Sequence, residues 1–548
     1  MSQLNIWPRF LAGVTALALM GGIRTAQSAG KERPNVLFIV CDDLNHYVLH
    51  GKDAPQAKTP NIDGLARQGV TFANNHAVTP VCGPSRTCFW TGVYPQWHGN
   101  YNVWKWDSIP LLKNSVPMQQ HFLNNGYEVY GTGKLFHEGA GGPFYTRYGI
   151  PPNYGSWPWK GKGPEENVPH PAQTELFTAN LPQNIQRDLN FGPLSNVPEW
   201  KPDPAGKFPG YAGWRSFGKP FRYVNDDDRD QMPDEMSAQF AIEVLRQKHD
   251  RPFFLGVGFI RPHTPLYAPK KYFDMFPLES VQLPPRLTND LDDCAVILRQ
   301  HWLLGFQKFH AVMAGGGVPL WRQWVQAYLA CMAFADEQVG AVLTALDQSP
   351  CRDNTIVVLI GDNGYHLGEK DCIQKWQLWE ESTHVPLFIR APGAASGQVC
   401  QRPTSLIDLY PTLIDLCGLP KSPNAGKSEA PLGGHSLRPL LKDPRHGSWT
   451  GPTAALSVVS HEPDGATNTG PHFSIRSEKW RYTLCSNDEE ELYDHVADPN
   501  EWTNLAKKPE YAKAKRELRA QLTKLVRAST GPVKSEPQTP NPGPGKSR

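Results

Sequence analysis

Four short apolar runs in this chain of 548 residues are each followed at once by polar residues of catalytic type. The runs are 35–40 (NVLFIV), 127–131 (YEVYG), 253–259 (FFLGVGF) and 355–360 (TIVVLI). The polar residues that follow them are Asp42, Asp43, Lys134, His137, Arg261, His263, Asp362 and Asn363. Two of these groups, at 42–43 and 362–363, offer only oxygen ligands, which suit a hard cation such as calcium better than zinc or copper. The basic members could bind an anion or transfer a proton.

A second feature with chemical potential is the segment Cys82-Gly83-Pro84-Ser85-Arg86, with Thr91-Gly92 downstream. Pro84 suits the first turn of a helix, where its missing N–H costs nothing. Cys82 is therefore expected at a helix N-terminus, with free amide donors facing an anion. A disulfide between Cys82 and Cys88 is the structural alternative. If the helix forms, six residues span about 9 Å and turn the two side chains to different faces, too far for a bridge.

The elements that must position these residues are the four apolar runs, which have the character of buried parallel strands. Open α/β sheets bind ligands beyond the carboxyl ends of their strands, so all eight polar residues are candidates for one site. Helical patterns lie between the strands, at 118–125 and 321–347. This alternation predicts a large, doubly wound α/β domain with a mixed or parallel sheet. The stretches 138–235 and 275–320 have little periodicity and are expected to be long surface loops that shape the pocket.

The domain organisation follows from changes in composition along the chain. Residues 1–29 have the pattern of a cleaved secretory signal, since Arg9 precedes an apolar run at 11–20 that is too short to span a bilayer. We expect a catalytic domain at 30–445, a smaller α+β domain at 446–528 and a disordered tail at 529–548. The smaller domain should contain strands at 454–460 and 480–485 and a charged helix at 511–526.

The charge of the mature chain is balanced. The 55 Lys and Arg exceed the 53 Asp and Glu by two, and residues 1–29 carry two arginines and no acid. The mature chain therefore has no net positive charge that would attract polyanions over a distance, and nucleic-acid binding finds no support. No later run reaches about 20 apolar residues, which predicts a protein free of the membrane after signal cleavage, in a periplasm or secreted. The ten cysteines predict one or two disulfides at most, with Cys400 and Cys417 as the best candidate pair.

The segment at 82–92 resembles the signature of the sulfatase family, C-x-P-S-R followed by T-G. The match extends from about Arg33 to Leu505, and the segments 133–137, 261–265 and 383–386 are most similar to iduronate-2-sulfatase and its bacterial relatives. This family belongs to the alkaline-phosphatase-like superfamily. Two positions depart from the pattern: Trp90 stands where the family usually has Leu, and Asn363 stands where a His usually follows the metal-binding Asp.

The resemblance implies a reaction, the hydrolysis of sulfate esters, and a role for each matching residue. Cys82 would be oxidised to formylglycine by a sulfatase-maturing enzyme, and one hydroxyl of the hydrated aldehyde would attack sulfur. One calcium ion would be held by the residues Asp42, Asp43, Cys82, Asp362 and Asn363. Lys134 and Lys375 would bind sulfate oxygens, and His263 would protonate the leaving alcohol. His137 would accept a proton from the diol, while Arg86 would bind the formylglycine side.

Three functions remain open at this point. The first is a sulfatase acting on sulfated carbohydrate, such as a glycosaminoglycan. The second is a phosphonate monoester hydrolase or phosphodiesterase of the same superfamily, and the third is a non-catalytic binder of sulfated glycans. The sequence identifies neither the sugar nor the position of its sulfate.

Overall fold

The computed structural model describes residues 33–50, 56–159, 185, 189–195, 213–301, 303–428, 430–461 and 470–530. The signal sequence predicted at 1–29 and nearly all of the tail predicted at 529–548 lie outside these ranges. The described residues from Pro34 onward belong to one compact unit. The predicted domain boundary at 445/446 stays a prediction.

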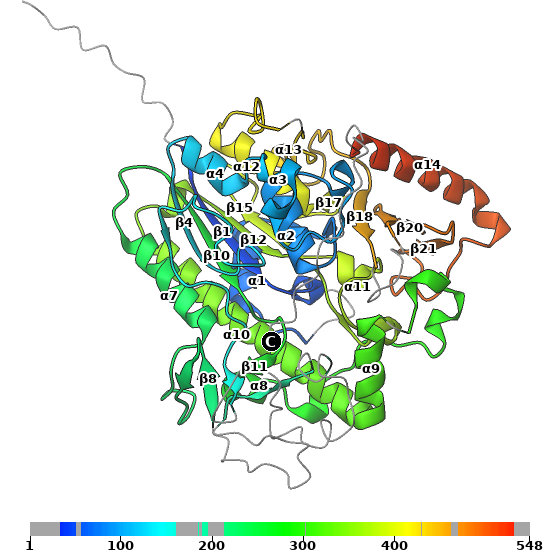
Figure 1. The fold of residues 1–548 in the computed structure, drawn as a ribbon, viewed down its shortest axis with the longest axis horizontal. Helices are drawn as coiled ribbons and strands as arrows, with labels where there is room; N and C mark the ends of the chain where they lie inside the picture. The colour runs from blue at the N-terminus through cyan, green and yellow to red at the C-terminus, as the bar shows by residue number, and fades with distance from the viewer. Residues whose placement is uncertain are drawn as a thin grey trace, which may run out of the picture. The chain divides into compact units, whose positions relative to one another are not determined.

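The core of the fold is an eight-stranded sheet (Figure 1). In spatial order its strands are β16 (Gln398–Cys400), β2 (Val70–Phe72), β15 (Leu387–Arg390), β12 (Thr355–Gly361), β1 (Asn35–Cys41), β10 (Phe253–Phe259), β4 (Glu128–Gly133) and β5 (Arg147–Tyr148). The run from β12 to β5 is parallel, whereas β15 is antiparallel to both of its neighbours. All four predicted strands are present and adjacent, which confirms the mixed α/β fold.

The register brings the carboxyl ends of three strands to one edge of the sheet. Cys41, the last residue of β1, pairs with Phe259 of β10 and with Gly361 of β12. The polar residues that follow β1 and β12 therefore leave the sheet side by side. Neighbouring strands lie about 4.8 Å apart, so short side chains from these two ends can meet.

Both faces of this sheet are buried, which explains why the strands are apolar throughout rather than alternating. In β1, Leu37, Ile39 and Cys41 face one apolar layer, and the intervening residues face the other. The first layer includes α1 (Pro60–Gln68), α7 (Pro233–Arg246) and α10 (Gly317–Asp347), and the second includes α2 (Cys82–Thr91), α4 (Met118–Asn124), α12 (Leu409–Cys417) and α13 (Arg438–Lys442). Figure 1 shows α7 and α10 running together beneath the sheet. The sheet is therefore doubly wound, as predicted.

The helix α10 is the longest in the described part of the chain, with 31 residues. Its length and composition would allow it to cross a membrane, but 83% of its most apolar window is buried inside the protein. It packs against α7, α1 and β11 (Leu266–Ala268). These contacts identify α10 as a core helix, whose apolar character comes from packing against the sheet.

A second sheet of four antiparallel strands follows in the chain, in the order β18 (Ala455–Val459), β19 (His472–Arg476), β20 (Trp480–Leu484) and β21 (Glu490–Asp494). The helix α14 (Ala512–Ala528) packs on it through Leu518 and Leu522. The strands β18 and β20 and the helix match the prediction within two residues. The predictions omitted β19 (HFSIR) and β21 (EELYD), which have only two apolar residues each and so lack a continuous apolar run.

Three predictions are wrong. The segment 138–235 is not all loop, because β5, at the edge of the main sheet, and several further short strands lie in it. The segment 275–320 is not all loop, because it contains the helix α9 (Leu304–Gly315), whose Phe306, Phe309 and Val312 are buried at a spacing of three residues. The predicted disulfide between Cys400 and Cys417 is absent, and none of the ten cysteines takes part in a disulfide. Cys400 ends an edge strand and Cys417 ends a helix; both are buried among apolar side chains, where a thiol packs as a small hydrophobic group.

Candidate active site

The acidic residues predicted for a metal meet at the shared edge of β1 and β12. The backbone N–H of Asp43 donates to Asp362 Oδ1 at 3.0 Å, and Asn363 Nδ2 donates to Asp43 Oδ1 at 2.7 Å. Carboxylate oxygens of Asp42, Asp43 and Asp362 lie within 4.8 Å of one another. The structure therefore brings all four predicted oxygen ligands into one cluster, and each of them is at most 1% exposed.

A tyrosine fixes the turn that presents Asp43. This residue has φ +61°, an uncommon conformation for a side chain other than glycine. The Tyr328 hydroxyl, from α10, donates to the Asp43 carbonyl at 2.7 Å and accepts the backbone N–H of Asn45 at 3.0 Å. The turn is thus held by a buried side chain from a distant part of the chain, and the sequence alone gave no signal for Tyr328.

Two oxygens in the cluster fit a cation. Asp43 Oδ2 and Asn363 Oδ1 are buried and accept no hydrogen bond from any described residue. Buried oxygens are almost always partnered in proteins, so unsatisfied acceptors beside three carboxylates suit a bound positive ion. An amide and carboxylates form the hard donor set of calcium or magnesium.

Cys82 begins α2 and lies against this cluster. All ten residues of the helix are buried, and Ser85 Oγ donates to the Asp362 carbonyl at 2.5 Å. Burial alone would raise the pKa of the Cys82 thiol, but Lys134, Lys375 and His137 outweigh it and hold the pKa well below its usual range. Cys88 lies one and a half turns further along α2 and is also a free thiol, which rules out the alternative Cys82–Cys88 disulfide. The environment of residue 82 favours a negative charge.

Three permanent cations balance the three carboxylates. Arg86 Nε donates to Asp362 Oδ2 at 2.8 Å, Lys134 Nζ contacts Asp42 Oδ2, and Lys375 Nζ contacts Asp43 Oδ1. The sequence predicted sulfate contacts for the two lysines, whereas here both contact the carboxylates. Burial would lower the pKa of Lys134, yet Asp42 and the Cys82 thiolate raise it well above the ordinary value. Burial would likewise lower the pKa of Lys375, but Asp43 and the Cys82 thiolate raise it above the ordinary value.

Glycines allow Lys134 to reach the centre. Gly133, the last residue of β4, has φ +69°, and a Cβ there would lie 1.9 Å from the Gly258 carbonyl oxygen. The backbone N–H of Lys134 donates to the same oxygen at 2.9 Å. A side chain at position 133 would push β4 away from β10, so this glycine permits the turn that points Lys134 inward.

The two predicted histidines flank the cluster. His137 lies close enough to the Cys82 side chain to help lower the pKa of the thiol. His263 Nδ1 donates to the Thr264 carbonyl at 2.6 Å, which directs Nε2 towards Asp43 Oδ2 at 3.7 Å. Arg261 does not join them, although it was a candidate for the same site. Its guanidinium donates to carbonyl groups, including that of Tyr154, and so supports the surrounding loop.

Aromatic residues that the sequence did not reveal complete the surroundings. Lys134 Nζ lies 4.9 Å from the centre of the Tyr154 ring, which in turn lies 5.0 Å from the His263 ring. Trp104 packs edge-on against His137, with 4.8 Å between ring centres, and against Trp376 at 6.0 Å. Tyr154 and Trp104 come from segments without periodicity, where no pattern could have singled them out.

The segment that carries Lys375 is held in place by two backbone hydrogen bonds of the next residue, Trp376. Trp376 has φ +78°; its N–H donates to the Pro80 carbonyl at 2.9 Å, and its carbonyl accepts a hydrogen bond from His461 Nε2 at 2.8 Å. Pro80 stands two residues before Cys82, and His461 follows β18 of the second sheet. The position of Lys375 therefore depends on both the nucleophile segment and the second sheet.

The comparison with known proteins decides the family. The family model described as sulfatase matches residues 34–419, and the model for the C-terminal part of N-sulphoglucosamine sulphohydrolase matches residues 368–528. The chain belongs to the sulfatase family. The hydrolysis of sulfuric esters is therefore its activity, and the family is in general formylglycine-dependent and metal-binding.

Individual sulfatases show how far the similarity extends. A sulfatase of Formosa agariphila is 32% identical over 90% of this chain and 87% of its own length. Iduronate 2-sulfatase of Mus musculus is 27% identical over 71% of this chain and 69% of its own length. A solved structure in complex with its substrate D-glucosamine-2-N,6-O-disulfate superimposes with a TM-score of 0.62 at 21% identity, over 91% of this chain and 98% of that chain. The likeness to iduronate 2-sulfatase is thus lower than to another sulfatase, and it assigns no substrate.

Proposed function

We propose that this sulfatase is exported, to a periplasm or out of the cell, and removes sulfate from carbohydrate substrates with formylglycine at position 82 and one calcium ion. The single observation that carries the proposal is the position of Cys82, a buried thiol with a lowered pKa at the N-terminus of α2, against the acidic cluster. An ordinary structural cysteine is packed among apolar groups and has a raised pKa, as Cys88 has. The names of the related proteins, which include sulfated-sugar hydrolases, agree with a carbohydrate substrate.

The metal would be held by Asp42, Asp43, Asp362 and Asn363, whose oxygens fit a hard cation. A calcium ion at this position would polarise the nucleophilic oxygen at residue 82 and lower its pKa. The described cluster alone carries three positive and three negative permanent charges. A divalent cation would leave it with two positive charges, which complements a sulfate ester and a nucleophilic anion.

The side chains around residue 82 take complementary roles in the proposed reaction. Lys134 and Lys375 stabilise the charge on the transferring sulfuryl oxygens. His137 accepts a proton at residue 82, since it is one of the groups that lower the pKa of the side chain there. His263 Nε2 donates a proton to the leaving alcohol, because Nδ1 is committed to the Thr264 carbonyl.

The test of this proposal is the chemical state of residue 82 in protein from its native host. Trypsin releases the peptide 68–86, and mass spectrometry distinguishes an aldehyde from a thiol at Cys82. We expect the lighter, aldehyde-bearing peptide, whose formation requires a maturing enzyme. An unmodified thiol in protein that is active on an aryl sulfate would refute the mechanism.

Substrate comparison addresses the alternatives. We expect an aryl sulfate to be hydrolysed faster than an aryl phosphonate monoester with the same leaving group. Faster turnover of the phosphonate would favour the second superfamily activity. Absence of any turnover in protein that carries the aldehyde would favour a glycan-binding role.

A further inference from the structure

Tyr154 is in contact with two side chains that the proposed reaction assigns to the substrate. Lys134 Nζ lies 4.9 Å from the centre of the Tyr154 ring, and the centre of the His263 ring lies 5.0 Å from it. Lys134 is proposed to bind the sulfuryl oxygens, and His263 is proposed to protonate the leaving oxygen. Because one S–O bond joins these two parts of a sulfate ester, a side chain that contacts both residues lies beside the leaving alcohol.

The backbone of Tyr154 is fixed by a buried arginine. Arg261 Nη1 donates to the Tyr154 carbonyl at 3.0 Å, and the backbone N–H of Arg261 donates to Asp234 Oδ2 at 2.9 Å. Gly155 leaves room for the guanidinium, since a Cβ there would lie 2.3 Å from Arg261 Nη2. Tyr154 itself is half-buried, so part of its surface is accessible to a ligand. The loop therefore holds this residue in a defined position before a substrate binds.

The Tyr154 ring is neutral. Burial raises the pKa of its hydroxyl, Lys134 lowers it, and Asp42 and the Cys82 thiolate raise it again, so that the pKa lies above the ordinary value. A neutral phenol adds no charge to the centre and offers an apolar ring with one polar tip. Such a surface suits the C–H groups and hydroxyls of a ring-shaped alcohol.

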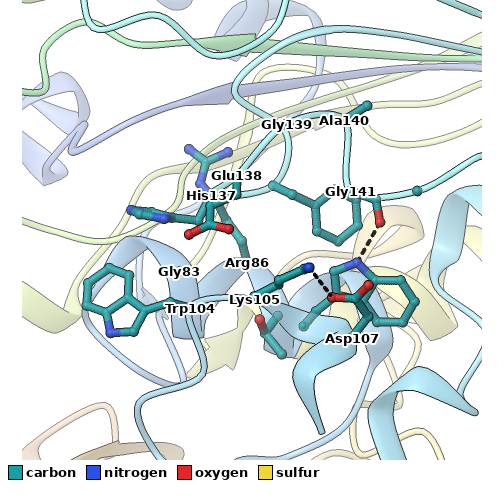
Figure 2. A pocket seen from close by; sticks show the side chains of 14 residues that line it. Gly83, Arg86, Trp104, Lys105, Asp107, His137, Glu138, Gly139, Ala140 and Gly141 are labelled. Atoms are coloured by element: carbon teal, nitrogen blue, oxygen red, sulfur yellow. Dashed lines mark hydrogen bonds and ion pairs between the residues drawn. The ribbon is translucent and has the colours of Figure 1, made fainter. Parts of the chain in front are cut away.

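A cavity beside the nucleophile position does not suit the leaving alcohol. It has a volume of about 270 Å³, lies between α2 and the loop that follows β4, and is lined by Gly83, Trp104 and His137 among others (Figure 2). Among the described residues that line it, neither His263 nor Lys134 is present. An alcohol in this cavity would not meet the proposed general acid, so the Tyr154 side of the centre is the better place for it.

We infer that Tyr154 contacts the leaving alcohol and is a specificity-determining residue that favours a ring over a short acyclic group. This inference rests on the proposed function. The sulfuryl group alone does not need the contact, because Lys134 keeps its ion pair with Asp42 when Tyr154 is removed. Loss of the ring should therefore weaken the binding of ring-bearing ligands and spare small sulfate analogues.

The test uses sulfonates in which a CH₂ group replaces the ester oxygen, so that the mature enzyme binds them without hydrolysis. Phenylmethanesulfonate and cyclohexylmethanesulfonate carry a ring in the leaving position, whereas ethanesulfonate carries only a methyl group there. Calorimetric titration measures the three dissociation constants. Tyr154→Ala should weaken the binding of both ring ligands about tenfold and that of ethanesulfonate less than about twofold. Tyr154→Phe keeps the ring and should stay within about twofold of the native enzyme for all three.

Tyr511→Ala is the matched control. Tyr511 is also half-buried and packs against an aromatic ring, that of Trp480 in the second sheet, with 6.0 Å between ring centres. This variant should bind all three sulfonates with the native affinity.

An equal loss for ethanesulfonate and the ring ligands in Tyr154→Ala would overturn the inference, because Tyr154 would then act through Lys134 alone. Unchanged binding of the ring ligands in this variant would also overturn it, since the leaving group would then lie elsewhere. So would a native enzyme that hydrolyses an aryl sulfate but binds neither ring ligand. Failure on the aryl sulfate as well would instead count against the proposed function, so the two failures are distinguishable.

Discussion

His461 Nε2 donates a hydrogen bond of 2.8 Å to the carbonyl oxygen of Trp376, the residue after Lys375. Trp376 lies in a left-handed conformation that few non-glycine residues adopt. The bond therefore holds an otherwise unfavourable backbone that directs Lys375 into the active site.

The substitution His461→Phe should weaken sulfate binding. Loss of a hydrogen bond worth about 1 kcal/mol would release Trp376 and reduce the affinity for inorganic sulfate and kcat/KM for an aryl sulfate, each about fivefold. Calorimetric titration with sulfate and steady-state kinetics measure the two effects. His472→Phe is the matched control, since that ring lies 5.6 Å from the His461 ring but accepts its hydrogen bond from the backbone N–H of Ser486. Equal losses in both variants would show a packing effect only.

Acid should destabilise the folded protein through its buried histidines. Burial lowers the pKa of His461 to about 4, below the ordinary 6.5. The unfolded chain then binds more protons between these values, so the contribution to stability is complete above pH 6.5 and is lost as the pH falls towards 4. For one such histidine the loss is about 3 kcal/mol. Urea unfolding at pH 7.5 and 4.5 should show a shallower decline for His461→Gln, whereas His50→Gln, at an exposed site, should follow the native curve.

Tyr328 should control the affinity for the calcium ion proposed at the acidic cluster. Tyr328→Phe removes the hydroxyl that holds the Asp43 turn, and loss of such a supporting partner typically costs about 10–100-fold in metal affinity. Calcium titration of the metal-free enzyme measures this. Tyr410→Phe removes a similar buried hydrogen bond, to the Val116 carbonyl, far along the chain from the cluster. An equal loss of affinity in that control would mean that the effect arises from general loosening.

The second sheet is joined to the active-site segment by a buried ion-pair network. Arg481 in β20 contacts Glu380 and Glu501 and donates to the Leu378 carbonyl at 2.9 Å. Arg481→Met removes the one cation that contacts both Glu380 and Glu501, leaves them with Arg476 and His495 as weaker compensation, and should lower the free energy of unfolding by about 3 kcal/mol. Arg519→Met, at an exposed pair with Glu490, should cost less than about 1 kcal/mol. Similar values for the two variants, measured by denaturant unfolding, would contradict this role of Arg481.

The sequence predicts the central strands and the acidic cluster well because short segments of the chain are enough to identify them. Apolar runs without alternation identify strands buried on both faces, and the rule that sites form at strand ends brings Asp42 and Asp362 together. The helix α9 was missed because the Gly-rich segment after it suggested a loop, while its buried Phe306 and Phe309 indicated a helix only over a short span.

The supporting residues of the site could not be predicted in the same way. Tyr328 is one of many buried residues of α10, so the sequence gives it no special feature. Its role depends on the hydrogen bond to the Asp43 carbonyl, which only the folded structure reveals. His461 depends on a contact between segments more than 80 residues apart. Such residues carry no motif, because their function consists in reaching a backbone carbonyl elsewhere in the chain.

The burial of α2 restricts the time at which its thiol can be modified. Cys82 is 2% exposed, and Ser85 and Arg86 are 1% exposed, so the whole recognition segment is shielded once the domain has folded. If Cys82 is converted to formylglycine as proposed, the modifying enzyme must reach this segment before α2 packs against the sheet. Maturation and folding therefore compete for the same stretch of newly made chain, and a chain that folds first would be trapped with an unconverted thiol.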